Sequence, residues 1–374
     1  MKRSNVFQRM GAAVRNFGFK QWFLLILNIA LVLMSIGCAA GLHFVSNTLG
    51  GLTAAGRFRG AGEIRFAQLA CYLPVDDGKT EEEIYAFRQE LERTLVEQSL
   101  EAPEGGRLYI DAYYGTASVT ISTENGTAAV KAIGTGGDFF YFHPMTLRGG
   151  SYIKGSDLMD DLVVLDEEMA WRLYGGTDLA GLPVSINGEP FVISGVIARD
   201  TDFATNKAYT GDGGVFMSFS AMRRLMEPAS ITGYEIVMPD PITGYAKGMA
   251  EDTFPIGTGD VVENSSRYGL LHLLEVMQGF GLRSMRTNGV IYPYWENAAR
   301  LTEDYAALLL VLAVLFALCP LTFAAALVIR EIRRAYRFAK AKIPEKVEAA
   351  VEKRREERLE RSYAKDQDKE AGGK

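Results

Sequence analysis

Hydrophobic residues are concentrated in two uninterrupted runs, and elsewhere along the chain they are interspersed with polar residues. The first run covers residues 22–42 and the second covers residues 305–329, and neither contains a charged side chain. Each run reaches the roughly 20 residues that an α-helix needs to cross about 30 Å of hydrocarbon. A core helix of a soluble protein is rarely so long and so uniformly apolar. The pattern therefore predicts two transmembrane helices, over residues 21–44 and 304–329.

Between the two runs, short apolar segments are separated by turn-forming residues. Residues 63–73 predict a strand, and residues 107–122 and 126–137 predict two strands joined by an Asn-Gly turn. Thr80 and Glu83 have capping-box spacing and precede a segment with helical hydrophobic periodicity. A further helix is expected from about residue 267 to residue 285. Strands and helices alternate irregularly, which favours an α+β domain.

The stretch "LVVLDEEMAWRLYGGTDLAGLPVSINGEPFVISGVI", residues 162–197, has three adjacent acidic residues and could be mistaken for an acidic site. "LVVL" is typical of a buried strand. Asp166 is placed to cap the helix that follows, and the acids after it suit the positive end of the helix dipole. Asn187 and Gly188 predict the turn of a hairpin with alternating apolar positions. We therefore interpret the stretch as a strand, a helix and a hairpin.

Charge is distributed unevenly and predicts the orientation. Residues 1–20 and residues 330–374 each have a net charge of +5, and residues 21–329 have a net charge of −16. Basic residues that flank a span tend to stay in the cytoplasm. We expect a cytoplasmic basic leader (1–20), an extracytoplasmic domain (45–303) and a cytoplasmic charged helical tail (330–374). The acidic domain does not suit nucleic acid, because phosphate contact needs a basic face.

The cysteines agree with this layout. Cys38 and Cys319 lie within the apolar runs, so Cys71 is alone in the external region and has no partner there for a disulfide. "SIGCAAG" offers a weak lipoprotein-like cleavage site before Cys38. However, the apolar run continues past Cys38 to Leu42 and is longer than the usual signal core. We therefore expect the first span to be retained.

The sequence contains no constellation that indicates catalysis. It has no GxxxxGK[ST] phosphate loop, no GxSxG, no CxxC and no HxxxH, so it predicts neither a P-loop ATPase nor a common zinc site. His143 is isolated from other metal-ligand types, and we interpret the aromatic cluster at 139–142 as core filling. We expect no catalytic, cofactor-binding or metal-binding residues, and a protein that is not an enzyme.

The tail and the spans supply the candidate functional positions. A basic cluster directly after the second span is expected to face anionic lipid or a cytoplasmic partner. Two residues lie in the middle of the spans. Asn28 in the first span is expected to pack against another helix, and Pro320 is expected to kink the second span. Trp295, shortly before the second run, is expected to pack within a stalk helix. The basic cluster consists of Arg330, Arg333, Arg334, Arg337, Lys340 and Lys342.

The order of elements in residues 134–197 resembles the extracytoplasmic core domain of MacB/FtsX-type ABC transporter permeases. An aliphatic strand is followed by a helix with Ala and an aromatic residue before Gly. "DLAG" then leads into the hairpin, which ends in "ISGVI". The layout of leader, span, external domain, stalk and span extends the resemblance over about residues 1–330. It implies a MacB-like core of two subdomains, the second over about residues 136–230, and a dimeric permease that transmits ATP-driven motion.

One departure affects the function that the resemblance implies. Permeases of this family have four spans, with a cytoplasmic coupling helix after the second, whereas here one span and a charged tail follow the domain. We therefore expect a shortened permease that works with a separate ABC ATPase and a second permease subunit, as a homo- or heterodimer. The tail helix is then the candidate ATPase contact, and its few apolar positions are equally typical of a solvated, salt-bridged helix. The alternative is a membrane sensor or assembly scaffold that acts through its extracytoplasmic domain without transport.

Overall fold

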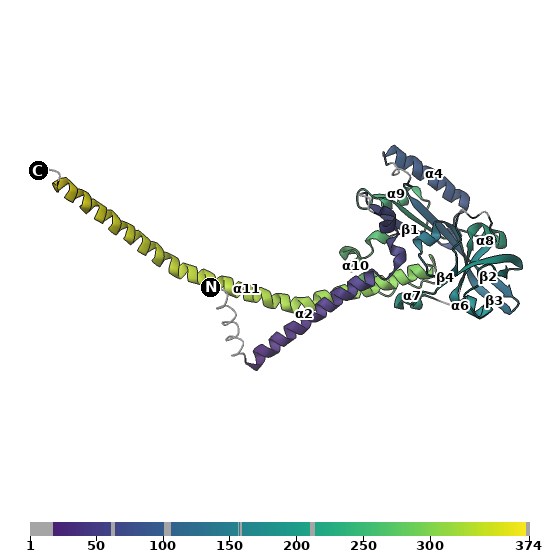
Figure 1. Ribbon diagram of the computed structural model, residues 1–374, viewed down its shortest axis with the longest axis horizontal. Helices are drawn as coiled ribbons and strands as arrows, with labels where there is room; N and C mark the ends of the chain where they lie inside the picture. The colour runs from purple at the N-terminus through teal and green to yellow at the C-terminus, as the bar shows by residue number, and fades with distance from the viewer. Residues whose placement is uncertain are drawn as a thin grey trace. The chain divides into compact units, whose positions relative to one another are not determined.

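The computed structural model describes residues 18–60, 64–100, 106–155, 157, 159–209 and 214–371 (Figure 1). The chain divides into two compact units. One unit comprises the segments up to Ala39 and from Val311 onward, and the other is Ala40–Leu310. Most of the predicted basic leader, up to residue 17, lies outside the described residues.

Two long helices contain the apolar runs. They are α2 (Phe19–Ser46) and α11 (Tyr294–Ala371), and both are long and apolar enough to cross a membrane. Within their shared unit, the hydroxyl of Ser35 on α2 donates a hydrogen bond to the carbonyl oxygen of Ala313 on α11 at 2.9 Å. The two helices correspond to the two predicted spans.

The unit Ala40–Leu310 is an α+β domain built on one sheet, which confirms the predicted fold class. The order along the sheet is β10-β1-β9-β2-β3-β8-β5-β7-β4, and β6 pairs with β2 and β7. The strands are β1 (Phe66–Tyr72), β2 (Ile110–Thr123), β3 (Gly126–Gly137), β4 (Leu147–Gly150), β5 (Leu162–Asp166), β6 (Pro183–Ile186), β7 (Glu189–Ile197), β8 (Gly214–Ser218), β9 (Gly233–Pro239) and β10 (Asp260–Glu263). The remaining helices of this unit are α3 (Ala54–Arg59), α4 (Glu81–Glu97), α5 (Phe139–Phe142), α6 (Glu167–Tyr174), α7 (Phe203–Ala208), α8 (Phe219–Leu225), α9 (Tyr245–Thr253) and α10 (Leu270–Val276), with 3₁₀ turns at Gly50–Thr53, Val75–Asp77, Asn264–Ser266 and Met277–Gly279.

The strand pairings close a ring in one half of the sheet. β2 pairs with β3, β3 with β8, β8 with β5, β5 with β7, β7 with β6, and β6 pairs again with β2. Alternate residues such as Val119 and Ile121 on β2 and Val163 and Leu165 on β5 belong to one buried cluster, as the period of two along a strand requires. The ring uses residues of β2 and β3 in addition to those of the predicted second subdomain.

The other half of the sheet is buried on both faces. Leu69 and Cys71 of β1 pack into the same cluster as α4 and α9, whereas Ala70 and Tyr72 pack into a second cluster with residues of α3 and α5. Every residue of β9 is buried, as expected of a strand with helices on either side. This half therefore has three layers, with the sheet in the middle.

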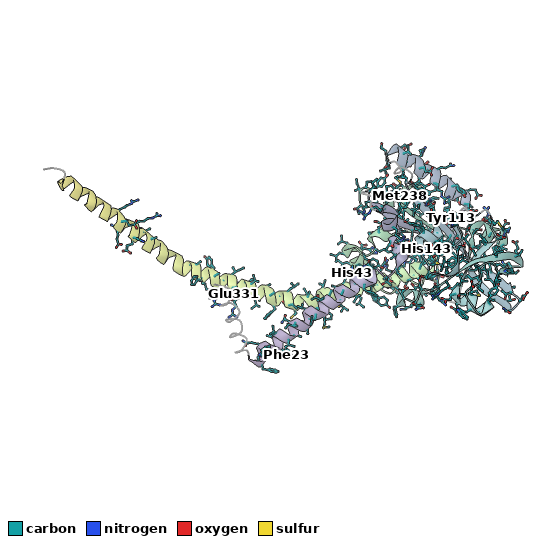
Figure 2. All side chains as sticks on the ribbon, viewed as in Figure 1. Phe23, His43, Tyr113, His143, Met238 and Glu331 are labelled. Atoms are coloured by element: carbon teal, nitrogen blue, oxygen red, sulfur yellow. The ribbon has the colours of Figure 1, made fainter. Side chains whose placement is uncertain are left out.

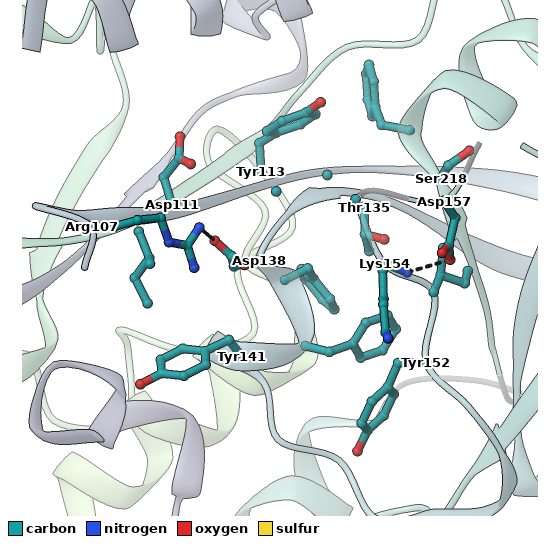
Figure 3. A pocket seen from close by; sticks show the side chains of 18 of the residues that line it. Arg107, Asp111, Tyr113, Thr135, Asp138, Tyr141, Tyr152, Lys154, Asp157 and Ser218 are labelled. Atoms are coloured by element: carbon teal, nitrogen blue, oxygen red, sulfur yellow. Dashed lines mark hydrogen bonds and ion pairs between the residues drawn. The ribbon is translucent and has the colours of Figure 1, made fainter. Parts of the chain in front are cut away.

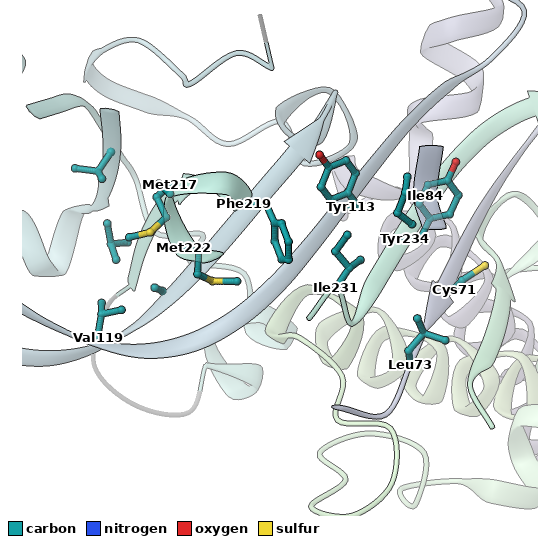
Figure 4. Close-up of a cluster of buried hydrophobic side chains, with 14 of the residues drawn as sticks. Cys71, Leu73, Ile84, Tyr113, Val119, Met217, Phe219, Met222, Ile231 and Tyr234 are labelled. Carbon is teal, nitrogen blue, oxygen red and sulfur yellow. The ribbon is translucent and has the colours of Figure 1, made fainter. Parts of the chain in front are cut away.

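One continuous core joins the two halves (Figure 4). Phe219, at the start of α8, and Ile231 lie between the side chains of the ring and those under α4. At Gly134 of β3 an added Cβ would lie 2.8 Å from the Cε of Met222, so α8 approaches the ring more closely than a larger residue would allow. The two halves are therefore packed as one body.

Local predictions within the domain are confirmed with one exception. Thr80 and Glu83 form a capping box on α4, Asp166 accepts a hydrogen bond from the N–H of Glu168, and β6 and β7 form the hairpin. Asn187 and Gly188 both have positive φ, 50° and 90°, as this two-residue turn requires. The long helix predicted over 267–285 is wrong: α10 ends at Val276, and glycines follow, of which Gly281 has φ 74°.

We predict that Asp166→Asn makes the domain more stable at pH 8 than the parent chain. Burial raises the pKa of Asp166 from 3.8 to about 6, although Arg199 opposes the shift. The parent is therefore most stable with Asp166 protonated, and it loses that stability as pH rises through about 6. Asparagine can accept the same capping hydrogen bond without becoming charged.

Circular dichroism is used to monitor thermal unfolding of the full-length parent and variant chains in detergent, at pH 4 and at pH 8. Asp166→Ala is the matched control, because it loses the cap at both pH values, at a cost of about 0.5–2 kcal/mol. An Asn variant that is less stable than the parent at pH 8 would contradict the assignment.

Candidate functional site at the start of the long C-terminal helix

Charged side chains meet inside the domain at the first turns of α11. Glu296, Arg300 and Glu303 have helical i, i+4, i+7 spacing and share one face of the helix. That face is buried, with Glu296 only 1% exposed and Glu303 0% exposed. Arg267, which follows the 3₁₀ turn Asn264–Ser266, is also only 1% exposed. We call these four residues, with Arg283 and His272, the charged junction.

Glu296 is held by three donors. Its Oε2 accepts hydrogen bonds from Arg267 Nη2 at 2.5 Å and from the hydroxyl of Tyr72 at 2.9 Å, and its Oε1 accepts one from Arg300 Nε at 2.7 Å. Tyr72 belongs to β1, an interior strand of the sheet. The carboxylate therefore connects α11 directly to the sheet.

Glu303, two turns further along α11, lies among three cationic or ionisable groups. Its carboxylate oxygens are 2.6 Å from Arg283 Nη1, 3.3 Å from Arg267 Nη1 and 3.5 Å from His272 Nε2. Burial alone would raise the pKa of Glu303, but Arg267, together with His272 and Arg283, lowers it to about 2. Glu303 is therefore ionised at neutral pH although its side chain is completely buried.

Arg267 bridges the two glutamates. Its Nη2 contacts Glu296, its Nη1 contacts Glu303, and its Nε donates to Asn264 Oδ1 at 2.8 Å. Burial would lower the pKa of Arg267, but Glu296 and Glu303 raise it further above its usual value. A guanidinium does not deprotonate in proteins, so its burial here depends on both carboxylates.

Further contacts secure the same turns of α11. The backbone N–H of Met285 donates to Asn297 Oδ1 at 2.7 Å, and that of Gly281 donates to Asp304 Oδ2 at 3.1 Å. The guanidinium of Arg300 lies over the ring of Tyr292, 3.8 Å from its centroid. The loop between α10 and α11 is thereby bound to the helix that it precedes.

Trp295 differs from the expectation that it packs within a stalk. Its ring contacts Tyr114 of β2, with centroids 4.9 Å apart, and His143, at 4.6 Å. His143 in turn shares a 2.9 Å hydrogen bond with Glu235 of β9, and both side chains are buried. The start of α11 is therefore inserted against the sheet, because aromatic residues on both elements provide the packing surface.

The described residues include one large groove, of about 1600 Å³, away from the charged junction (Figure 3). Two of its arginines are paired with acids of the same groove. Arg88 binds Asp111 through two hydrogen bonds of 2.6 and 3.0 Å, and Arg107 donates to Asp138 at 2.6 Å. No group of three or more His, Cys, Asp or Glu side chains in the described part of the chain is arranged to hold a metal. The charged junction is therefore the stronger candidate, as a mechanical connection.

Comparison with known proteins agrees with this architecture. The profile of the MacB-like periplasmic core domain matches residues 26–243, more than half of the chain. The chain belongs to the MacB-like periplasmic core domain family. No curated protein matches the chain.

Two solved structures are similar to this MacB-like chain. The extracellular domain of the noncanonic ABC-type transporter YknZ from Gram-positive bacteria is 15% identical, with a TM-score of 0.33, and the match covers 50% of this chain and 88% of that one. The periplasmic region of MacB from Actinobacillus actinomycetemcomitans is 14% identical, with a TM-score of 0.38. The match covers 57% of this chain and 95% of that one.

The family match and the charged junction occupy different parts of the sequence. The matched range begins within α2 and ends shortly after β9, so it includes Tyr72. Arg267, Glu296, Arg300 and Glu303 all follow it. The junction therefore joins the MacB-like domain to a helix that the family match does not include.

The residues singled out from the sequence lie on the two long helices. Arg330, Arg333, Arg334, Arg337 and Lys340 are exposed on α11, where Figure 2 labels the nearby Glu331, and Lys342 lies on the same helix with its side chain outside those described. Asn28 donates to the carbonyl oxygen of Leu24 in its own helix at 2.7 Å, and α11 continues through Pro320. Their assigned roles remain predictions.

The charged junction was not among the features predicted from the sequence. A usable signal was present, because "ENAARLTED" directly precedes an apolar run and has alternating charges on one helical face. Such a face is usually solvated, however, and Arg267 is 29 residues away from Glu296 in the chain. Only the folded structure shows that these charges face inward.

We predict that Arg267→Met in this MacB-like chain lowers the free energy of unfolding by about 3–5 kcal/mol, because it leaves two buried carboxylates without their shared cation. Arg223→Met is the matched control: Arg223 pairs with Glu81 at 3.2 Å but is 46% exposed. Its loss should cost less than about 1 kcal/mol. The free energy of unfolding of both variants is measured by guanidinium unfolding in detergent, with tryptophan fluorescence as the signal. Equal effects would contradict the inferred role of Arg267.

A second prediction concerns pH. The pKa of Glu303 is lowered from 4.5 to about 2, so the stability that its charge provides is fully present above about pH 4.5 and is lost as pH falls toward 2. Glu303→Gln should destabilise the protein at pH 6, and its difference from the parent should shrink at pH 3. Unfolding at the two pH values tests this expectation, and a pH-independent difference would refute it.

Proposed function

We propose that the chain is a membrane subunit of an ABC transporter complex, which transmits ATP-driven motion to an extracytoplasmic domain and performs no catalysis itself. Membership of the MacB-like family supports this proposal. The observation that carries it is the charged junction, because a helix long enough to cross a membrane is bound through buried ion pairs to that domain.

The proposed orientation places both termini in the cytoplasm. It rests on the net charge of +5 in residues 1–20 and in residues 330–374. In this arrangement residues 21–44 and 304–329 cross the membrane, and residues 45–303 form the extracytoplasmic MacB-like core. The charged junction then lies just outside the membrane, where α11 enters the domain.

Transmission of motion requires that α11 does not slip against the domain. Apolar contacts alone would allow neighbouring arrangements of similar energy, because dispersion and burial are not directional. At the charged junction, a shift of α11 would separate Arg267 from Glu296 and leave buried charges unpaired, at a cost of about 3–5 kcal/mol. A displacement of the helix is therefore passed to the sheet through Tyr72.

The cytoplasmic end of α11 is proposed as the contact for a separate ABC ATPase. Arg330, Arg333, Arg334 and Arg337 have i, i+3, i+4, i+7 spacing, so they form one exposed basic face. Ile332 and Tyr336 are also exposed, by 62% and 68%, and are four residues apart. A helix with basic and apolar positions can bind a partner's groove while its Arg side chains contact anionic lipid. A second permease subunit would complete the complex, as a homo- or heterodimer.

Truncation after Arg330 tests this contact, because it removes the rest of the basic face with Ile332 and Tyr336, and co-purification of an ABC ATPase from the native membrane is the measurement. The expected result is loss of the ATPase. A truncation that removes only residues 359–374 is the matched control, because it leaves the basic cluster in place, and it should retain the ATPase.

Unchanged co-purification after the Arg330 truncation would show that the contact lies elsewhere. Reproducible absence of any ATPase from the untruncated protein would instead favour a membrane sensor or scaffold. The two outcomes therefore separate a wrong contact from a wrong function.

A further inference from the structure

Exposed apolar side chains gather on α10. Leu270, Leu271 and Leu274 are 61%, 77% and 49% exposed. Most soluble surfaces show such residues singly, and a cluster of them indicates an interaction site. The segment that follows adds further exposed apolar residues, namely Phe280 at 43% and Leu282 at 79%.

The opposite face of α10 shows where this cluster lies along α11. Leu273 and Val276 are buried against Ala306 and Ala307, the second and third residues of the apolar run of α11. The last turns of α2 join the same contact through Leu42. Because α10 has seven residues and is about 10 Å long, its exposed leucines lie within about 10 Å of the level at which the first apolar run ends and the second begins.

A second element brings an apolar residue to the same level. Phe203, the first residue of α7, is 66% exposed, and its ring lies 5.4 Å from that of Tyr305. Tyr305 is the first residue of the apolar run. Figure 1 shows α7 and α10 on either side of the beginning of α11. We call Phe203, Leu270, Leu271 and Leu274 the apolar collar.

Three charged groups near α10 are directed away from the collar, whereas Glu275, on α10 itself, is exposed. His272 is turned toward Glu303, and Arg283 lies 2.6 Å from the same carboxylate. Arg286, further along the loop, pairs with Asp260 at 3.5 Å. These contacts lie on the domain side of Ala306, so the outward surface of α10 consists of the collar leucines with Glu275 at its end.

We infer that the apolar collar is a lipid-contacting surface that inserts into the outer membrane interface around the exit of the two spans. Apolar faces of short helices at this level are buried about 5–10 Å into the headgroup and acyl boundary. Continuity with the apolar runs favours lipid over a second protein, because the collar meets them through Ala306 and Leu42. The inference rests on the proposed membrane placement of α2 and α11.

The test uses the full chain in vesicles of phosphatidylethanolamine and phosphatidylglycerol, with a nitroxide spin label at one cysteine at a time. Cys38 and Cys319 are replaced by alanine. Cys71 is buried, and burial, with Glu235, raises its pKa to about 12, so it should remain unlabelled. Collision of the label with oxygen, which partitions into lipid, is compared with collision with a water-soluble nickel chelate.

The label sites are Leu271→Cys and Phe203→Cys in the collar, with two references. Val75→Cys is the aqueous reference, because Val75 is 63% exposed on a 3₁₀ turn of the domain, and Leu315→Cys, 56% exposed, is the reference within the apolar run of α11. We expect both collar labels to show a higher ratio of oxygen to nickel accessibility than Val75, at a depth shallower than Leu315. All four sites are exposed, so labelling should not disturb the fold.

Two results would overturn the inference while leaving the proposed function intact. Collar labels that match the aqueous Val75 reference, while Leu315 reports lipid, would show that the collar does not reach the membrane. Collar labels protected from both reagents would show that a protein surface covers it. If Leu315 itself were aqueous, the membrane placement would fail, and the proposed function with it.

Discussion

The attachment of α11 to the domain depends on the burial of Arg267 between two glutamates. A guanidinium keeps its charge in a protein interior, so this side chain is stable there only with carboxylates close by. Both carboxylates, Glu296 and Glu303, come from one face of α11. Rotation of the helix, or a shift along its axis, would remove at least one of them. A single buried cation therefore fixes both the rotation and the axial position of the helix.

The sheet extends the effect of this contact across the domain. Tyr72, which donates to Glu296, lies on β1 between β10 and β9. β9 pairs with the first part of β2, whose 14 residues continue into the ring. The ring and the three-layered half thus share strands and one core. On the proposed function, motion at the start of α11 moves the whole domain, since its two halves share strands and one core.

The sequence predicted those features that depend on local chemistry. Residues 162–197 could be assigned because an N-cap, a dipole-matched first turn and an Asn-Gly turn act over a few residues. The two spans could be assigned from length and apolarity alone. The helix over 267–285 was predicted too long: α10 ends at Val276, a 3₁₀ turn follows, and Gly281 then adopts a positive φ that an α-helix does not allow.

The charged junction could not be assigned in the same way, because burial of a charge is a property of tertiary structure. Glu296, Arg300 and Glu303 have the spacing of an ordinary solvated helix face, and nothing nearby in sequence marks Arg267 as their partner. His143 shows the same limitation, since its partner Glu235 is 92 residues away. Spacing shows which charges share a face, but it does not show what covers that face.

The two charged regions of α11 contain the same residue types in opposite environments, and this contrast bears on how the helix could work. At residues 296–303 the charges are buried and paired, so that end resists displacement. At Arg330–Arg337 they are exposed, and the ion pair that Arg334 makes there, with Glu331 at 3.8 Å, is itself on the surface, so a partner can reach them readily. No charge lies between these regions, from residue 305 to residue 329. A helix with one fixed end and one accessible end suits the transmission of a force better than the binding of a ligand within the membrane.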